Sequence, residues 1–294
     1  MLEFVNFYLI PGVVIGCIYA LGAIGISLIF AILRVPHLAH GDMMMVGAYC
    51  ALAVVTIAGA SPYLALPAAM AATAGLAVLT DRLFYRPLRR VRTVMVIIAS
   101  FGVALMFRSL VMLLWGPQMQ TYQTGIQRPL VIEGLRLAEK HIFIVLATLA
   151  LGVALHLFLT RTTAGKSMRA VSDDPDLARV CGIRPERVIL WMWVVAAALC
   201  AAAGVFLGLD TQLIPLMGFN LLLPMFAAAI LGGIGRPYGA ILGGLVIGLA
   251  EEIATYPLFG EPLVPPTYKS AVAFTIMVLM LLWRPTGLLK GRVL

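Results

Sequence analysis

Long apolar stretches alternate with short polar segments along almost the whole chain. Each stretch approaches the ~20 helical residues that cross the hydrocarbon core of a bilayer. Backbone groups in lipid must be hydrogen-bonded within the segment itself, so these spans are expected to be helices. The alternation typical of an outer-membrane barrel is absent from the sequence. The predicted spans cover residues 8–33, 43–60, 62–80, 93–115, 141–160, 189–209, 218–235, 237–254 and 268–284.

This pattern predicts an all-α fold, a polytopic transmembrane bundle of about eight or nine spans, with residues 1–294 forming one membrane domain. The composition agrees, because 62% of the residues are hydrophobic and 12% are charged, whereas a soluble domain is about a quarter charged. The glycine-rich stretch 218–254 leaves two interpretations open, two tilted spans or one re-entrant hairpin. Small-residue pairs predict closely packed helices; they are Gly12 and Gly16, Gly239 and Gly243, and Gly244 and Gly248.

The basic residues are distributed unevenly. The net charge is +8, yet Lys and Arg lie in short loops between apolar runs, where they set membrane topology rather than bind nucleic acid. Sixteen of these 21 residues fall on one side of the predicted bundle and four on the other. The basic side is expected to be cytoplasmic, so nine crossings place the N-terminus outside and the C-terminus in the cytoplasm. The basic side comprises Arg34, the cluster from Arg82 to Arg92, the loop from Arg161 to Arg187, Arg236, Arg284, Lys290 and Arg292, and the other side Arg128, Arg136, Lys140 and Lys269.

Patterns that would indicate catalysis or a cofactor fail when their spacing is checked. Gly165-Lys166-Ser167 looks like the end of a phosphate-binding loop, but Thr160 stands where that motif requires glycine, and no strand precedes it. No Ser-His-Asp or Cys-His arrangement has a spacing that supports nucleophilic catalysis. The four cysteines show no spacing typical of a disulfide or a zinc site. We therefore expect the chain to be no enzyme and to bind no cofactor or metal.

A few polar residues within or beside the spans allow more than one interpretation. His37, His40 and Asp42 have the spacing of metal ligands on one helical turn, but no further His or Cys occupies a matching position. Hydrogen bonds that hold a bent loop at a membrane end are the favoured interpretation. Arg108 is the one charge well inside a span. It either has a functional role or extends toward the interface and pairs at a helix end.

The segment from Ala164 to Ile183 is a polar island between two apolar runs. It predicts one short helix from Thr163 to Ser172 and a second that starts at Asp174-Pro175, where the aspartate caps the helix and proline takes its first position. Gly182 suits the residue that follows a helix end, and Pro185 opens the next span. Such a loop either binds lipid head groups through its basic residues or docks a partner at the cytosolic surface.

Four stretches of the chain resemble one family of membrane proteins. Gly165-x3-Arg169-Ala170, followed by Ala178 and Gly182-Ile183, is similar to the cytoplasmic coupling loop of ABC importer permeases. The other stretches are Tyr19 to Ala23 with Arg34-Val35, Ala39 to Met43 and Gly47 to Tyr49; Tyr85 to Arg89; and Pro224 to Glu251. Together they resemble the branched-chain amino-acid ABC transporter permease family, and its LivH-like subunit more than the partner subunit. His37 departs from the pattern, which usually has a smaller polar residue there, often Asn.

The resemblance implies a transport subunit of the bacterial inner membrane rather than an enzyme. It would import leucine, isoleucine or valine, while related permeases carry urea, short amides or other amino acids. A stand-alone secondary transporter is the further alternative. Besides lipid and the small-molecule solute, the implied partners are a second homologous permease, two cytosolic ATPase subunits that hydrolyse ATP, and a periplasmic binding protein.

The resemblance also assigns roles to residues. In the coupling loop at about 161–188, the ATPase contact would be made by Gly165, Arg169, Ala170, Ala178, Gly182 and Ile183. Polar groups are scarce in the spans, so those that occur there are candidates for the translocation path. They are Tyr19, His40, Asp42, Asn220 and Glu251.

Overall fold

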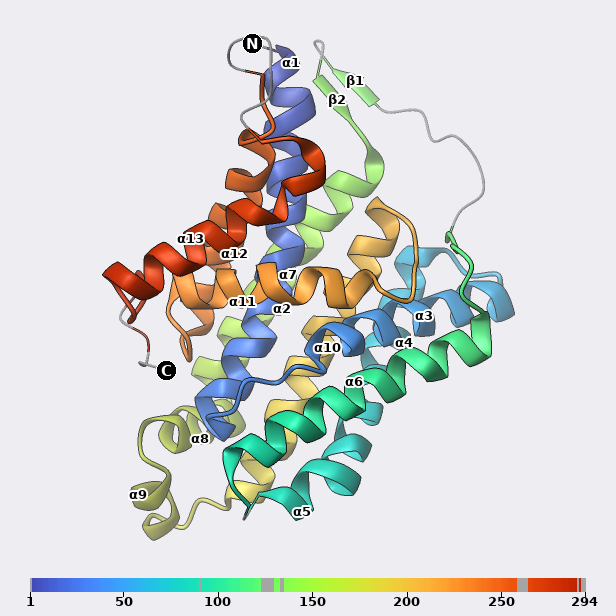
Figure 1. Ribbon diagram of the computed structural model, residues 1–294. Helices are drawn as coiled ribbons and strands as arrows, with labels where there is room; N and C mark the ends of the chain where they lie inside the picture. Colours follow the sequence, from blue (N-terminus) through green and yellow to red (C-terminus); the bar gives the residue numbers. More distant parts are fainter. Residues whose placement is uncertain are drawn as a thin grey trace.

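All nine predicted apolar segments are helices in the computed structural model, which describes residues 2–89, 91–122, 130–132, 135–257, 264–289 and 291. They are α2 (Ile10–Leu33), α3 (His40–Ala58), α4 (Pro62–Thr80), α6 (Thr93–Trp115), α7 (Glu139–Arg161), α10 (Pro185–Asp210), α11 (Met217–Gly232), α12 (Pro237–Ile253) and α13 (Ser270–Trp283). Within the described residues, six helical segments are long and apolar enough to cross a membrane, and α11 and α13 are shorter apolar helices. The fold is the predicted all-α bundle (Figure 1).

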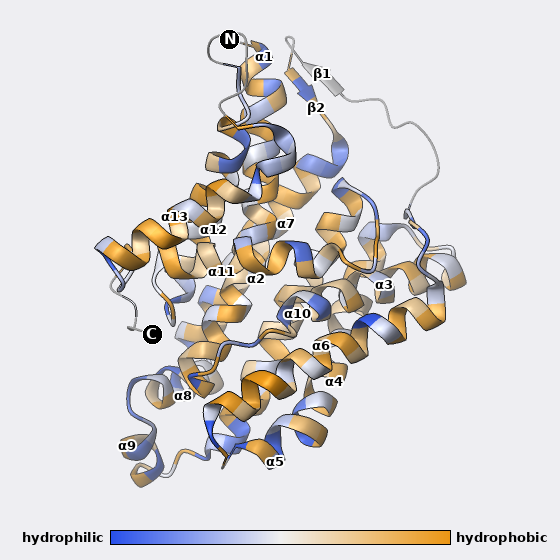
Figure 2. Cartoon of the chain, viewed as in Figure 1, coloured by the Kyte–Doolittle hydropathy of each residue, from blue (hydrophilic) through white to orange (hydrophobic). Residues whose placement is uncertain are grey.

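Two helices, α2 and α10, form the centre of the bundle. α2 packs against α12, α10, α11 and α7, and α10 packs against α4, α2 and α3. α6, α7 and α13 lie at the periphery and expose large apolar side chains, such as Leu113 on α6 and Leu282 on α13. Their outward faces are strongly hydrophobic (Figure 2). Exposed apolar surface of this extent on long helices is suited to contact with lipid.

Two helices are extended by a π-helical turn that precedes a proline. The N-terminal helix starts before its predicted first residue, as α1 (Leu2–Phe4), and passes through η1 (Val5–Leu9) into α2. α4 likewise continues beyond its predicted end, through η2 (Asp81–Tyr85) into α5 (Arg86–Leu88). Pro11 and Pro87 each lie two residues after the π turn. Because proline lacks the N–H of the helical ladder, a locally wider turn accommodates the missing bond.

A small hairpin lies in the connection between α6 and α7. β1 (Leu130–Ile132) and β2 (Leu135–Leu137) pair antiparallel, with Val131 opposite Arg136. The backbone N–H of Arg136 donates to Asn6 Oδ1 at 3.0 Å, which ties the hairpin to the N-terminal helix. Strands of three residues give no periodic signal, so the sequence did not predict them. A short helix, η3 (Pro266–Tyr268), precedes α13. Arg90, Arg128, Lys290 and Arg292, which contribute to the predicted charge asymmetry, lie outside the described residues.

The predicted small-residue pairs lie where helices cross at close range. A Cβ atom added to Gly248 would lie 2.4 Å from Gly16 Cα, and one added to Gly244 would lie 2.4 Å from Ala20 N. A side chain at either glycine would therefore force α12 away from α2. The backbones of the two helices touch, as the glycine pairs predict.

Residues 218–254 form two helices, α11 and α12, joined by a tight turn at 233–236. Gly233 and Gly235 in this turn have φ angles of +106° and +85°. The 16 residues of α11 extend about 24 Å at the helical rise, less than the ~30 Å of a hydrocarbon core. The turn is held by the C-terminal segment, since the N–H of Leu288 donates to Leu231 O at 2.8 Å.

Replacing Gly248 by alanine is expected to destabilise the bundle, because the added methyl group would meet the backbone of Gly16 at 2.4 Å. Overpacking of this kind costs about 1–3 kcal/mol. Gly102→Ala on α6 is the matched control, since nothing lies within 4 Å of its added Cβ and alanine has the better helix propensity. Thermal unfolding of the purified proteins in one detergent compares them. An unchanged midpoint for Gly248→Ala would contradict the close contact.

Candidate functional site

The polar island forms two capped helices, α8 (Thr163–Asp173) and α9 (Pro175–Val180), at one end of the bundle (Figure 1). Thr162 Oγ1 caps α8 by accepting the N–H of Gly165 at 3.0 Å. Asp174 Oδ1 caps α9 by accepting the N–H groups of Asp176 and Leu177 at 2.9 and 3.0 Å. Pro175 takes the first position of α9. The predicted start of the second helix is therefore confirmed.

α9 ends in a glycine turn of the kind that the sequence predicts. The N–H of Gly182 donates to Arg179 O, and that of Ile183 donates to Ala178 O, both at 3.0 Å. Gly182 has a φ angle of +82°, a left-handed conformation that is open to glycine because it has no Cβ. The turn leads directly into α10, which begins at Pro185.

The six residues predicted to contact an ATPase differ in exposure. Gly165 and Ala178 are buried, Ala170 and Ile183 are half-buried, and Arg169 and Gly182 are exposed. A Cβ atom on Gly165 would lie 2.2 Å from Phe158 O, so this glycine allows α8 to pack tightly against the end of α7. The buried members thus hold the loop against the bundle, and Arg169 and Gly182 are accessible to a partner.

α9 also exposes two apolar side chains that the sequence interpretation did not assign. Leu177 is 60% exposed and Val180 is 85% exposed, three positions apart on one side of the helix. α9 projects from the lower end of the bundle (Figure 1). Apolar side chains gathered at such a tip are typical of a docking surface. The signal that would have revealed them is the apolar pair at helical spacing between a predicted cap and a predicted helix end.

A second group of polar residues lies deep in the bundle, where α3 and α11 begin. His40 Nε2 lies 3.1 Å from Gly22 O, and Gly22 is near the middle of α2. The sequence interpretation placed this histidine at a membrane end; residues 34–39 instead return along α2, so that α3 starts beside the midpoint of α2. α11 starts at the same place, because a Cβ atom on Gly218 would lie 1.8 Å from Gly41 O. The first turns of two helices therefore meet in the interior.

An ion pair joins this junction to α6. Arg108 Nε and Nη2 each lie 3.1 Å from a carboxylate oxygen of Asp42, and the guanidinium carbon lies 4.8 Å from the centre of the Phe219 ring. The Asp42 side chain is fully buried and that of Arg108 is 15% exposed, so the arginine pairs at the start of a helix rather than extending to water. The first turn of α3 also favours a negative charge through the helix dipole. The pair fixes α3, α6 and α11 relative to one another.

The five predicted path residues lie around the middle of α2 but differ in access. Tyr19 Oη donates to Glu251 Oε2 at 2.7 Å and so links α2 to α12. Tyr19, His40, Asp42 and Glu251 are buried, and Asn220 on α11 is exposed. In this conformation the four buried residues lie between packed helices, and Asn220 is the exposed member of the five.

His37, which departs from the family pattern, belongs to an aromatic cluster. Its Nε2 lies 2.8 Å from Tyr85 Oη, and its ring lies 5.0 Å from the ring of Trp193. The rings of Tyr85 and Trp193 are stacked, with their centres 5.3 Å apart. The imidazole fills space in this cluster that an asparagine would leave open.

Comparison with known proteins identifies the family. The family described as branched-chain amino acid transport system / permease component matches residues 8–281. The chain belongs to this family. The high-affinity branched-chain amino acid transport system permease protein BraD of Pseudomonas aeruginosa is 32% identical, over 96% of this chain and 94% of BraD. LivH of Escherichia coli K12, with the same description, is 31% identical over 95% of this chain and 93% of LivH.

Two further likenesses bear on the subunit type and the fold. The permease protein LivM of Escherichia coli K12 is 30% identical over 52% of this chain and 35% of LivM. The closer likeness to LivH and BraD confirms the LivH-like assignment. The solved structure of PsaBC from Streptococcus pneumoniae in complex with Fab has a TM-score of 0.52 at 13% identity, over 97% of this chain and 93% of that chain, and shows the fold alone. From its family and its relatives, this chain is a multi-pass membrane permease component and not an enzyme.

Replacing Arg108 by glutamine leaves the buried carboxylate of Asp42 without its partner and is expected to lower stability by about 3–5 kcal/mol. The double variant Asp42→Asn, Arg108→Gln removes both charges and should be more stable than the single variant. Arg179→Gln is the control, because Arg179 pairs with Asp176 at 2.9 Å with 61% and 86% of the two side chains exposed, a geometry worth less than about 1 kcal/mol. Thermal unfolding ranks the four proteins. A double variant that is no more stable than Arg108→Gln alone would refute the pair.

Proposed function

We propose that the chain is the permease subunit of an ATP-binding cassette importer for leucine, isoleucine and valine. The observation that carries this proposal is similarity over nearly the full length. BraD and LivH, both named as permease proteins of high-affinity branched-chain amino acid transport systems, match 96% and 95% of this chain. The capped α8–α9 loop with its exposed tip supports the same function, because an importer permease needs a surface that receives motion from an ATPase.

The importer is completed by a second homologous permease, two cytosolic ATPase subunits and a periplasmic binding protein. The partial likeness to LivM, a permease protein of the same kind of transport system, supports a second and related permease. Leu177 and Val180 support an ATPase partner, because a docked ATPase would remove both apolar side chains from water.

Motion of the ATPases reaches the transmembrane helices through α9 and α8. Asp174 both follows α8 and caps α9, which joins the two helices without a flexible linker. α8 packs against α7, α10 and α2. Because α10 and α2 form the centre of the bundle, a displacement of α9 moves the helices around which the others pack.

The solute passes along the exposed face of α11, between this chain and the second permease. Asn220 lies on this face, together with Phe219 and Leu223, which are 40% and 43% exposed. The amide of Asn220 can hydrogen-bond the polar groups of an amino acid, and the apolar neighbours suit a branched aliphatic side chain. Arg108 lies behind Phe219 and holds this part of α11 in place.

The end of the bundle that carries α8 and α9 faces the cytosol, and the C-terminus lies on the same side. Arg89 from the cluster of 82–92 and Arg179 from α9 line the same cavity, and Arg82 and Arg187 line a neighbouring one. The two largest groups of basic residues thus share one end of the bundle. This distribution agrees with the excess of Lys and Arg that cytoplasmic loops carry.

Val180→Asp and Arg169→Glu are expected to leave membrane insertion intact and to weaken ATPase binding about tenfold or more, because each places a negative charge in the docking surface. Arg136→Glu is the matched control, since it reverses an exposed charge on β2, at the opposite end of the bundle from α9 (Figure 1). Co-purification of the ATPase subunits and solute-stimulated ATP hydrolysis in proteoliposomes measure the effect. Unchanged uptake in both variants would refute the assignment of α9 as the docking surface.

Uptake of labelled solutes tests the transport activity. The reconstituted complex with its own binding protein is expected to accumulate leucine, isoleucine and valine in an ATP-dependent manner. Their rates should lie within about 200-fold of one another, because one methylene is worth about 1–3 kcal/mol in an apolar pocket. Urea, a short amide and a charged amino acid form the comparison panel. Preference for one of these would overturn the proposed solute class, and uptake without the ATPase subunits would overturn the importer.

A further inference from the structure

An open cavity of about 460 Å³ lies where α8 packs against the start of α10, at the end of the bundle that carries the basic loops. On the α8 side it is lined by Thr163 and Ser167, which both carry a hydroxyl group. On the α10 side it is lined by Arg184, Arg187 and Trp191. The glycine turn that follows α9 forms a further part of the wall. The cavity therefore lies at the base of the coupling loop, where the loop joins the bundle.

The two arginines of this cavity are not neutralised within the described part of the chain. Among the described residues, neither Arg184 nor Arg187 forms an ion pair, and no Asp or Glu lines the cavity. Glu186, which lies between them in the sequence, lines a neighbouring cavity. Both arginines are exposed. Two guanidinium groups without carboxylate partners, beside two hydroxyl groups, supply the positive charge and the hydrogen-bond donors that a phosphate group requires.

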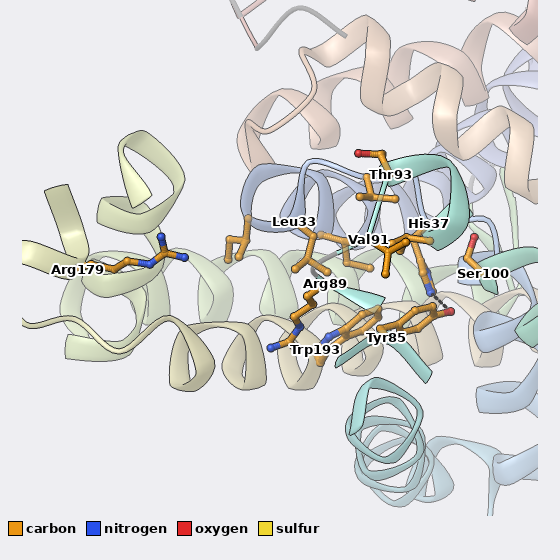
Figure 3. Close-up of a pocket in the computed structure, with 13 residues that line it drawn as sticks. Leu33, His37, Tyr85, Arg89, Val91, Thr93, Ser100, Arg179 and Trp193 are labelled. Atoms are coloured by element: carbon orange, nitrogen blue, oxygen red, sulfur yellow. Dashed lines mark hydrogen bonds between the residues drawn. The ribbon is translucent and has the colours of Figure 1, made fainter. Parts of the chain in front are cut away.

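Two other arginines at this end of the bundle already have partners. Figure 3 shows Arg89 and Arg179 at the cavity beside the aromatic cluster. Arg89 pairs with Asp81 at 2.5 Å, and Arg179 pairs with Asp176 at 2.9 Å. Carboxylates of the chain thus balance the positive charge there. The cavity between α8 and α10 differs, because its two cations lack such partners.

The position of the cavity relative to the bilayer favours a lipid as the source of the phosphate. Trp191 is 43% exposed and lies one helical turn after Arg187 on the same face of α10. Its ring lies 6.0 Å from that of Phe158, near the end of α7. Tryptophan at the end of a span is typical of the head-group level of a membrane. The outward face of α7 is an apolar stripe that runs toward the same end. The stripe consists of Leu146, Leu149, Val153 and Leu157, which are 61%, 62%, 58% and 49% exposed.

We propose that this cavity binds the head group of an anionic phospholipid from the cytoplasmic leaflet. The phosphate accepts hydrogen bonds from Arg184 and Arg187, and the acyl chains lie over Trp191 and the apolar stripe of α7. Because the site combines residues of α8 and α10, the bound lipid holds the base of the coupling loop against the bundle. An acidic surface of an ATPase would match the charges but not the apolar border of the cavity. The leaflet follows from the orientation proposed above, whereas the binding itself does not depend on it.

Native mass spectrometry of the purified full-length chain measures this binding. The probes are phosphatidylglycerol and phosphatidylcholine with identical acyl chains. Phosphatidylglycerol is expected to bind about tenfold or more tightly, because it is anionic and the cavity offers no carboxylate to the positive charge of the choline group. Inorganic phosphate and glycerol 3-phosphate, which lack acyl chains, distinguish a free anion from a lipid. Neither is expected to displace phosphatidylglycerol.

Removal of the two arginine charges places the lipid in this cavity. The double variant Arg184→Gln, Arg187→Gln is expected to bind phosphatidylglycerol about 25-fold more weakly, because each basic residue near a membrane surface contributes about fivefold to the binding of anionic lipid. The double variant Lys166→Gln, Arg169→Gln is the matched control. It removes two exposed charges from α8 at the same end of the bundle, and neither residue lines the cavity. This control should bind as the unaltered protein does.

A negative charge inside the cavity provides a second and independent variant. Ser167→Asp places a carboxylate beside the arginines, where it repels the phosphate and competes for the guanidinium groups. Binding of phosphatidylglycerol is expected to weaken about tenfold or more. Ser172→Asp is the matched control, because Ser172 lies on the same helix and does not line the cavity.

Four results would overturn the proposal: equal affinity for phosphatidylcholine, displacement by phosphate or glycerol 3-phosphate, unchanged binding in both the arginine variant and Ser167→Asp, or equal losses in their controls. An arginine variant that keeps phosphatidylglycerol but no longer co-purifies with an ATPase would assign the two charges to a protein partner instead. The lipid-binding assay contains neither ATPase nor binding protein. Its outcome is therefore independent of whether the chain imports branched-chain amino acids.

Discussion

The ion pair between Asp42 and Arg108 determines where two helices of the bundle begin. A fully buried carboxylate is tolerated when a cation and a helix N-terminus neutralise it, and both conditions are met in the first turn of α3. α3 starts beside the middle of α2, and the preceding segment is partly buried in the bundle, with His37 and Ala39 buried and Arg34 exposed. That segment is hydrogen-bonded there, for example through the N–H of Leu38, which lies 3.3 Å from Ser100 Oγ. Buried, irregular backbone next to lipid is possible only under such conditions.

The same constraint explains the glycines around the junction. The first turns of α3 and α11 lie so close that their backbones touch. Gly41 and Gly218 form this contact, where neither position has room for a side chain. Gly22 and Gly25 likewise allow neighbouring side chains to approach α2 closely. A Cβ atom on Gly25 would lie 2.5 Å from the imidazole of His40. Charge neutralisation and close packing thus act at one point. α2, α3, α6 and α11 all contribute to it, which makes the junction the structural centre of the chain.

Local signals in the sequence predicted most of the helices and the loop. Apolar runs marked the nine helices, and Asp174-Pro175 with Gly182 marked the start and end of α9, because each of these signals depends on neighbouring residues only. The long-range contacts could not be predicted in this way. Asp42 and Arg108 are 66 positions apart, and Tyr19 and Glu251 are 232 positions apart. The exposure of the loop residues could not be predicted from the sequence either, since it depends on which side of α8 packs against α7.

The π turn at Asp81–Tyr85 has a consequence for the aromatic cluster. One extra residue in a turn rotates everything that follows by about 100° relative to a regular α-helix. Tyr85 therefore faces His37 and Trp193 because of this local change of pitch, not because of its spacing from the apolar residues of α4. A helical wheel drawn through α4 would place the tyrosine on the wrong side. The geometry of the aromatic cluster thus depends on a π turn of the backbone, which the periodicity of the side chains does not indicate.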